Sequence, residues 1–126
     1  MNLDNLARLI AMYNVWTDKL GWDTTDCAAA MILRVKGEWT EARFGITVEL
    51  IQEFLDVPKD VARALFFMHD YKNGKEARPK DYELFWKASD RDQRYIITNT
   101  LGRLGVSGGK TLIWNFNLRE PLGEPS

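Results

Sequence analysis

The sequence is poor in the residues that build disulfides and metal centres. Its one cysteine, Cys27, cannot form an internal disulfide, and its one histidine, His69, leaves no Cys/His set for a structural zinc ion. The chain also lacks a long apolar run, since the longest stretch without a charged residue, residues 9–17, is about half of what a membrane-spanning helix needs. No charged-then-apolar signal opens the sequence. We therefore expect a protein of the reducing cytoplasm that does not contact a membrane.

The length and composition favour one folded domain. A chain of 126 residues can bury one modest hydrophobic core but not two independent ones. With 45% apolar residues, it carries enough apolar surface to offset the entropy of folding. We expect a single domain over residues 1–119 and a disordered tail over residues 120–126.

The formal net charge of −1 hides an uneven distribution along the chain. Residues 1–71 hold eleven acidic and seven basic residues, whereas residues 72–110 hold nine basic and five acidic ones. A basic segment can hold a polyanion without making the whole protein basic. Lysines and arginines scattered over a solvated surface would give the same count, so this alternative stays open.

Apolar residues at three- and four-residue steps predict two helices in the N-terminal third. The first covers about residues 3–20. Its apolar stripe consists of Leu6, Leu9, Ile10, Tyr13, Trp16 and Leu20. The second begins near Thr24, is largely buried, and ends at about Lys36 because Gly37 follows.

Two short helices joined by a tight turn are predicted by the stretch TVELIQEFLDVPKDVARALFFM. Thr47 can cap the first helix, and Pro58 fits the first turn of the second. Asp56 and Val57 lie between them, where Val57 can plug the angle between the helices. The residues expected to face inward are Val48, Ile51, Phe54, Leu55, Val61, Ala62, Leu65 and Phe66. The alternative is an ordinary helical hairpin within a core.

After a turn-rich basic link, the sequence predicts a β-hairpin. Residues 82–87 and 94–98 give its two strands, with the charged turn 89–92 between them. A further strand follows, with Leu112, Trp114, Phe116 and Leu118 on one face. We therefore expect an α+β fold that is mainly helical, with a helix-turn-helix, a small β-hairpin wing and a C-terminal strand.

This order of elements resembles the winged helix-turn-helix of the multiple-antibiotic-resistance-regulator (MarR) family over about residues 3–102. The turn Leu-Asp-Val-Pro at residues 55–58 is similar to that family's Leu-Gly-Val-Ser turn, and SDRDQRYIIT followed by Gly102 looks like its Asp-Arg wing. The family's long C-terminal dimerisation helix has no counterpart here. The resemblance implies a DNA-binding regulator of transcription and, if the chain forms a homodimer, an interface made by the first helix and the last strand.

A second interpretation of residues 89–105 stays open. Ser89 can cap a helix with Asp92 three residues on, and Gly105 can stop it. The apolar side of this helix would consist of Ile97, Leu101 and Leu104. Strand propensity in RYIIT favours the hairpin, whereas periodicity over the longer window favours the helix. We prefer the hairpin.

The residue arrangements that enzymes need are mostly missing. A Walker phosphate-binding loop requires a glycine with four residues between it and the Gly-Lys pair, but for the pair in GVSGGKT Leu104 stands at that place and Gly105 comes one residue too late. Cys27 precedes three alanines, where a small buried thiol is common, and His69 stands without a nucleophile partner. Asp81, Glu83 and Lys87 lack the Glu-x-Lys spacing of metal-dependent nucleases. We expect no enzyme, no metal and no cofactor.

We therefore expect sequence-specific binding of double-stranded DNA by a helix over residues 58–69, with a wing near residues 82–98. The expected DNA-contacting residues are Lys59, Asp60, Arg63, Lys72, Lys75, Arg91, Gln93 and Arg94. The alternative is a winged-helix module that binds a protein instead, for example a virus- or plasmid-type modulator or inhibitor of a host polymerase or nuclease. The acidic isoelectric point of 5.8, Asp60 at a base-reading position and five tryptophans favour it.

Overall fold

The structure, a computed structural model, describes residues 1–16, 28–38, 47–68, 85–114 and 116, and these residues are mainly helical. The helices are α1 (Leu3–Val15), α2 (Ala28–Lys36), α3 (Thr47–Leu55), α4 (Lys59–Phe67) and α6 (Asp90–Val106). A further helical turn, residues 85–87, precedes α6.

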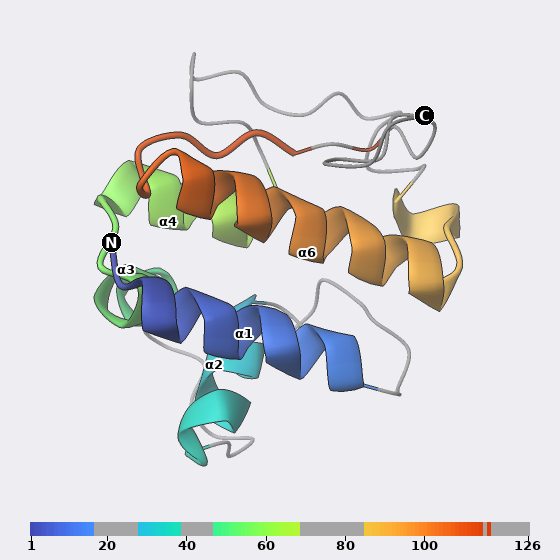
Figure 1. The fold of residues 1–126 in the computed structure, drawn as a ribbon, viewed down its shortest axis with the longest axis horizontal. Helices are drawn as coiled ribbons and strands as arrows, with labels where there is room; N and C mark the ends of the chain where they lie inside the picture. Colours follow the sequence, from blue (N-terminus) through green and yellow to red (C-terminus); the bar gives the residue numbers. More distant parts are fainter. Residues whose placement is uncertain (17–27, 39–46, 69–84, 115, 117–126) are drawn as a thin grey trace.

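One hydrophobic core joins all of these helices. Figure 1 shows α1 and α6 side by side along the long axis, running in opposite directions, with α2 below α1 and α3 beside the start of α1. α3 contacts both α2 and α4. The largest fully buried side chains come from every named helix and its flanks: Leu9, Tyr13, Met31, Ile32, Ile51, Leu55, Leu65, Met68, Phe85, Ile96 and Ile97. The described residues therefore form one packed unit.

α1 forms where its apolar stripe was predicted but ends earlier. The Asn2 side chain accepts a hydrogen bond from the Asn5 backbone N–H and so caps the start of the helix. The stripe is buried at Leu6, Leu9 and Tyr13. The helix ends at Val15 because Trp16 turns to extended backbone, whereas the predicted end was near residue 20. Residues 17–27, with the predicted start of the second helix, lie outside the described residues.

α2 has the burial and the end that its sequence predicted. Every side chain from Ala28 to Leu33 is buried. The helix ends at Lys36, and Gly37 follows with a φ of +72°. Glycine adopts this left-handed conformation without a steric penalty, so it can stop a helix.

The predicted β-hairpin wing is wrong, because residues 90–106 form the single helix α6. The Ser89 hydroxyl accepts a hydrogen bond from the Asp92 backbone N–H at 3.2 Å, and the acidic first turn suits the positive end of the helix dipole. The buried side of α6 consists of Gln93, Ile96, Ile97, Thr100, Leu101 and Leu104. A helix packs this whole side into the core against α1, which outweighs the strand propensity of RYIIT. Of the predicted first strand, residues 82–84 lie outside the described residues and residues 85–87 are helical.

α6 continues through Gly105, the residue expected to stop it. A Cβ atom at Gly105 would lie 2.8 Å from Leu6 Cδ2, so the glycine allows close approach of α1 and α6. The stop comes from Gly108 and Gly109, whose φ angles are +68° and +83°. The Gly109 N–H donates to the Leu104 carbonyl and the Gly108 N–H to the Gly105 carbonyl, which is a Schellman cap. The segment GVSGGKT is therefore a helix terminus.

The predicted C-terminal strand is also contradicted by the described residues. Residues 111–114 have no regular secondary structure, although Leu112 and Trp114 are buried as the alternation required. The Trp114 indole N–H donates to the Ala64 carbonyl of α4 at 3.3 Å. This segment therefore packs on a helix, which offers side-chain burial but no strand to pair with. Leu118 and the predicted tail, residues 120–126, lie outside the described residues.

Candidate nucleic-acid interface

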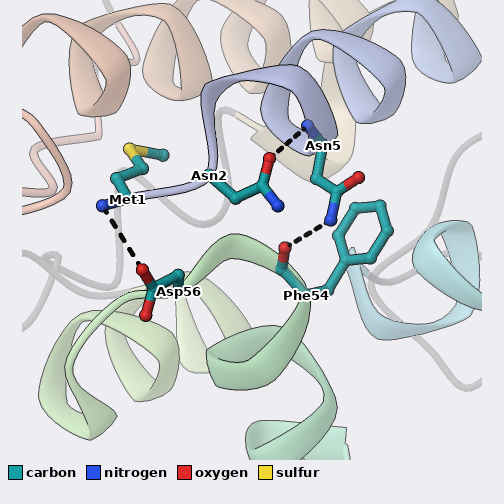
Figure 2. A network of polar contacts seen from close by, with 5 residues as sticks. All are labelled: Met1, Asn2, Asn5, Phe54 and Asp56. Carbon is teal, nitrogen blue, oxygen red and sulfur yellow. Dashed lines mark hydrogen bonds and ion pairs between the residues drawn. The ribbon is translucent and has the colours of Figure 1, made fainter.

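α3 and α4 are joined by a short turn of Asp56, Val57 and Pro58. Asp56 has a φ of +53°, and the Val57 N–H donates to the Gln52 carbonyl at 3.2 Å, which closes the end of α3. Asp56 occupies the place of the glycine in the resembled family's turn, and aspartate is one of the residues that tolerate this conformation. The α-amino group of Met1 lies 3.7 Å from the exposed Asp56 carboxylate (Figure 2).

The interface between α3 and α4 is apolar. Val57 is only 5% exposed and fills the turn, as predicted. The other buried side chains of the pair are Ile51, Phe54, Leu55, Val61, Ala62, Ala64 and Leu65. Val48 and Phe66, which were also expected to face inward, are partly buried. This packing fixes one side of α4 and leaves the other side to solvent.

The start of α1 holds the end of α3. The Asn2 backbone N–H donates to the Leu55 carbonyl at 2.8 Å, and the Asn5 side-chain amide donates to the Phe54 carbonyl at 2.9 Å (Figure 2). The last carbonyls of a helix have no partner within the helix, so these two bonds satisfy groups that would otherwise need water. They tie the helix pair to α1 and so set where α4 lies relative to the rest of the protein.

One continuous stripe of α4 is exposed. Lys59, Arg63 and Phe67 recur at four-residue steps, and Asp60 lies beside them. We call these four residues the α4 face. The Arg63 guanidinium carbon lies 6.0 Å from the centre of the Phe67 ring, and Phe67 is 50% exposed. Lys59 and Asp60 make no ion pair with another described residue.

The other predicted DNA-contacting residues do not join the α4 face. Lys72 and Lys75 lie outside the described residues. Arg91 is exposed in the first turn of α6, at the end of the long axis away from α4 (Figure 1). Gln93 is buried and donates its side-chain amide to the Phe85 carbonyl at 2.8 Å. Arg94 is partly buried, and its Nε atom is enclosed. The predicted site is therefore divided between two distant places.

Phe67 belongs to the exposed surface, and the sequence interpretation missed it. Its neighbour Phe66 had been assigned to the core, and the Phe66 and Phe67 rings meet edge to face at 4.8 Å. The signal was present in the spacing, because Phe67 follows Arg63 by four residues and must therefore lie on the same side of α4.

The charge around the α4 face is mixed. Over residues 47–68, the acidic residues are Glu49, Glu53, Asp56 and Asp60, and the basic residues are Lys59 and Arg63. All six are exposed, so four negative and two positive charges give this helix pair a formal charge of −2. Two of the acids, Glu49 and Glu53, belong to α3, whereas the α4 face itself carries two cations and one acid.

The described residues show neither a metal-binding cluster nor a membrane-spanning helix. They contain no group of three or more His, Cys, Asp or Glu side chains placed to hold a metal ion. Over the same residues, no helix combines the length and the apolar character needed to cross a membrane.

Comparisons with known proteins add no relative to this description. No protein-family model matches the chain, and no curated protein or solved structure matches it. The resemblance to the MarR family therefore stays an expectation from sequence. With the wing contradicted, it rests on the helix pair α3 and α4 and on the turn between them.

Proposed function

We propose that this protein binds double-stranded DNA by placing α4 in the major groove. The observation that supports this most strongly is the α4 face, in which Lys59, Asp60 and Arg63 are exposed on the second helix of a tightly joined pair. Helix-turn-helix proteins present their second helix to the groove in this way. A role in regulating transcription would follow from such binding.

The charged residues of the α4 face have two roles in this proposal: they attract the DNA phosphates and they distinguish between bases. Lys59, in the first turn of α4, suits a phosphate oxygen, as does the positive end of the helix dipole beside it. Arg63, one turn further on, suits a guanine edge or a phosphate because its planar fork of donors pairs with two acceptors at once. Asp60 is repelled by phosphates, so it can only contribute by selecting among bases.

A mobility-shift assay on a pool of random duplex DNA tests the proposal. It is run at low and at moderate salt, because contacts with phosphates weaken as salt rises. We expect the native protein to bind and Arg63→Ala to lower its affinity by about tenfold. Arg91→Ala is the matched control, since Arg91 is an exposed arginine of α6, away from the α4 face, and its loss removes the same charge. Circular dichroism checks that each variant keeps its helices.

The absence of any shift at low salt would overturn the proposal. Equal weakening by Arg63→Ala and Arg91→Ala would contradict the assignment of the interface to α4, because it would show that only the total charge matters.

A protein partner with a basic surface is the second candidate. The four exposed acids of α3, α4 and their turn favour it over DNA. The double substitution Glu49→Gln and Glu53→Gln has opposite expected effects for the two candidates. It should strengthen DNA binding by removing repulsion from phosphates. Binding to a basic protein that pairs with these two acids should instead be lost.

A further inference from the structure

The α4 face presents three different chemistries in a fixed order. The Asp60 carboxylate offers hydrogen-bond acceptors, Arg63 only donates hydrogen bonds, and Phe67 offers an apolar ring. At about 1.5 Å of rise per residue, Arg63 lies about 4.5 Å beyond Asp60 and Phe67 about 6 Å beyond Arg63. Successive base pairs are about 3.4 Å apart, so the three side chains span a few neighbouring base pairs.

Each of these chemistries matches one base edge of the major groove. A carboxylate accepts from the exocyclic amino group of cytosine, and it is repelled by guanine, which shows only acceptors there. An arginine donates to the two acceptors of guanine, O6 and N7. An aromatic ring packs against the methyl group of thymine. The Arg63 guanidinium carbon lies 6.0 Å from the centre of the Phe67 ring, so these two side chains can act on adjacent positions.

We propose that α4 selects a short DNA word in which Asp60 faces a cytosine, Arg63 faces a guanine on the same or a neighbouring base pair, and Phe67 faces a thymine methyl group. This inference rests on the proposed DNA binding and adds the bases that are read. Asp60 supplies selectivity without attraction, which explains an acid in the middle of a surface that approaches phosphates. The word is therefore defined by what Asp60 rejects as well as by what Arg63 and Phe67 accept.

The test begins with selection of bound duplexes from a random pool, followed by changes of single chemical groups in the selected word. Replacing guanine by 7-deazaguanine removes the N7 acceptor, and we expect about tenfold weaker binding of the native protein. The same replacement should leave Arg63→Ala unaffected. Replacing thymine by uracil removes the methyl group, which should weaken the native protein but not Phe67→Ala.

A change of specificity tests Asp60. The side-chain amide of asparagine pairs with adenine by accepting from the N6 amino group and donating to N7, so Asp60→Asn should shift the selected base at the cytosine position to adenine. Asp60 is exposed, so this substitution should leave the fold intact, and thermal unfolding checks this.

The outcomes distinguish a failure of this inference from a failure of the proposed DNA binding on which it rests. If no duplex is bound at low salt, the proposed function and the base assignment both fail. If duplexes are bound but the selected words lack this combination, or if 7-deazaguanine weakens Arg63→Ala as much as the native protein, only the base assignment is overturned.

Discussion

α4 and α6 both begin with a charged first turn, but their polar side chains have opposite surroundings. On α4, Lys59, Asp60 and Arg63 are all exposed, and the buried residues are apolar. On α6, Gln93 and Thr100 are fully buried, and the Gln93 Oε1 and Thr100 Oγ1 atoms have no hydrogen-bond partner among the described residues. A buried polar atom without a partner costs about 1–3 kcal/mol, so α6 forms despite this cost. Within the described structure, no side chain of α4 bears it.

The difference shows which interactions hold each helix. The pattern within the nine residues of α4 already separates an inner from an outer side. α6 gains its stability from apolar neighbours on α1, which is distant in the sequence, and this burial offsets the cost of its buried polar atoms. The exposed side of α4 therefore follows from the apolar pattern of the helix itself.

The largest effect is expected from the core side of α6. Leu101 is fully buried, so Leu101→Ala should lower the free energy of unfolding by about 2–5 kcal/mol. Urea unfolding followed by circular dichroism measures this. Val106→Ala is the control on the same helix, because Val106 is 92% exposed and its loss leaves no cavity. A small loss for Leu101→Ala would show that packing is not what holds α6.

The second effect concerns binding and compares one arginine on each helix. Arg63→Ala should lower DNA affinity by about tenfold, whereas Arg91→Ala, with the same loss of charge, should change it little. The physical reason is that Arg91 lies in the first turn of α6, away from the α4 face. Mobility shifts measured side by side decide this. A greater loss for Arg91→Ala would move the interface to α6.

The third effect tests whether residues 90–106 form a helix rather than a hairpin. Ser89→Ala removes the side chain that caps α6, so it should lower the free energy of unfolding by about 1 kcal/mol. Ser89→Asp keeps a capping oxygen and should remain near the native stability. In a hairpin turn the two variants would not differ in this way, so equal stabilities from urea unfolding would contradict the cap.

The smallest effect comes from two threonines on α6. Thr100→Val removes a buried hydroxyl that has no partner in the described part of the chain, so it should raise the free energy of unfolding by up to about 1 kcal/mol. The Thr98 hydroxyl donates to the Arg94 carbonyl at 2.9 Å, so Thr98→Val should lower it by about 0.5–1 kcal/mol. The opposite signs are the result to measure, and a loss for both variants would show that Thr100 has a partner.

The helices with a clear local pattern were predicted from the sequence. The break between α3 and α4, the buried Val57 and the stop of α2 at Gly37 all follow from residues within one or two turns of the place they affect. The same is true of three of the four residues of the α4 face, because the exposure of Lys59, Asp60 and Arg63 depends only on their positions on α4.

The remainder depended on contacts that are distant in the sequence. RYIIT has strand propensity, while Ser89 and the apolar spacing after it indicate a helix, and burial against α1 decides between them. The hydrogen bond from Trp114 to the Ala64 carbonyl joins residues 50 apart, and no local pattern announces it. The wing residues were therefore misplaced together with the element that was expected to carry them.

The hydrogen bond from Asn5 to the Phe54 carbonyl, across 49 residues, bears on how the protein folds. A second hydrogen bond, from Trp114 to the Ala64 carbonyl, does the same from the other side. Together the two bonds join the segments before and after α3 and α4 to that helix pair. Closing such long loops is slower than forming any single helix, so we expect folding to be limited by these closures. The α4 face would then reach its final position only when α1 and the segment after α6 have docked.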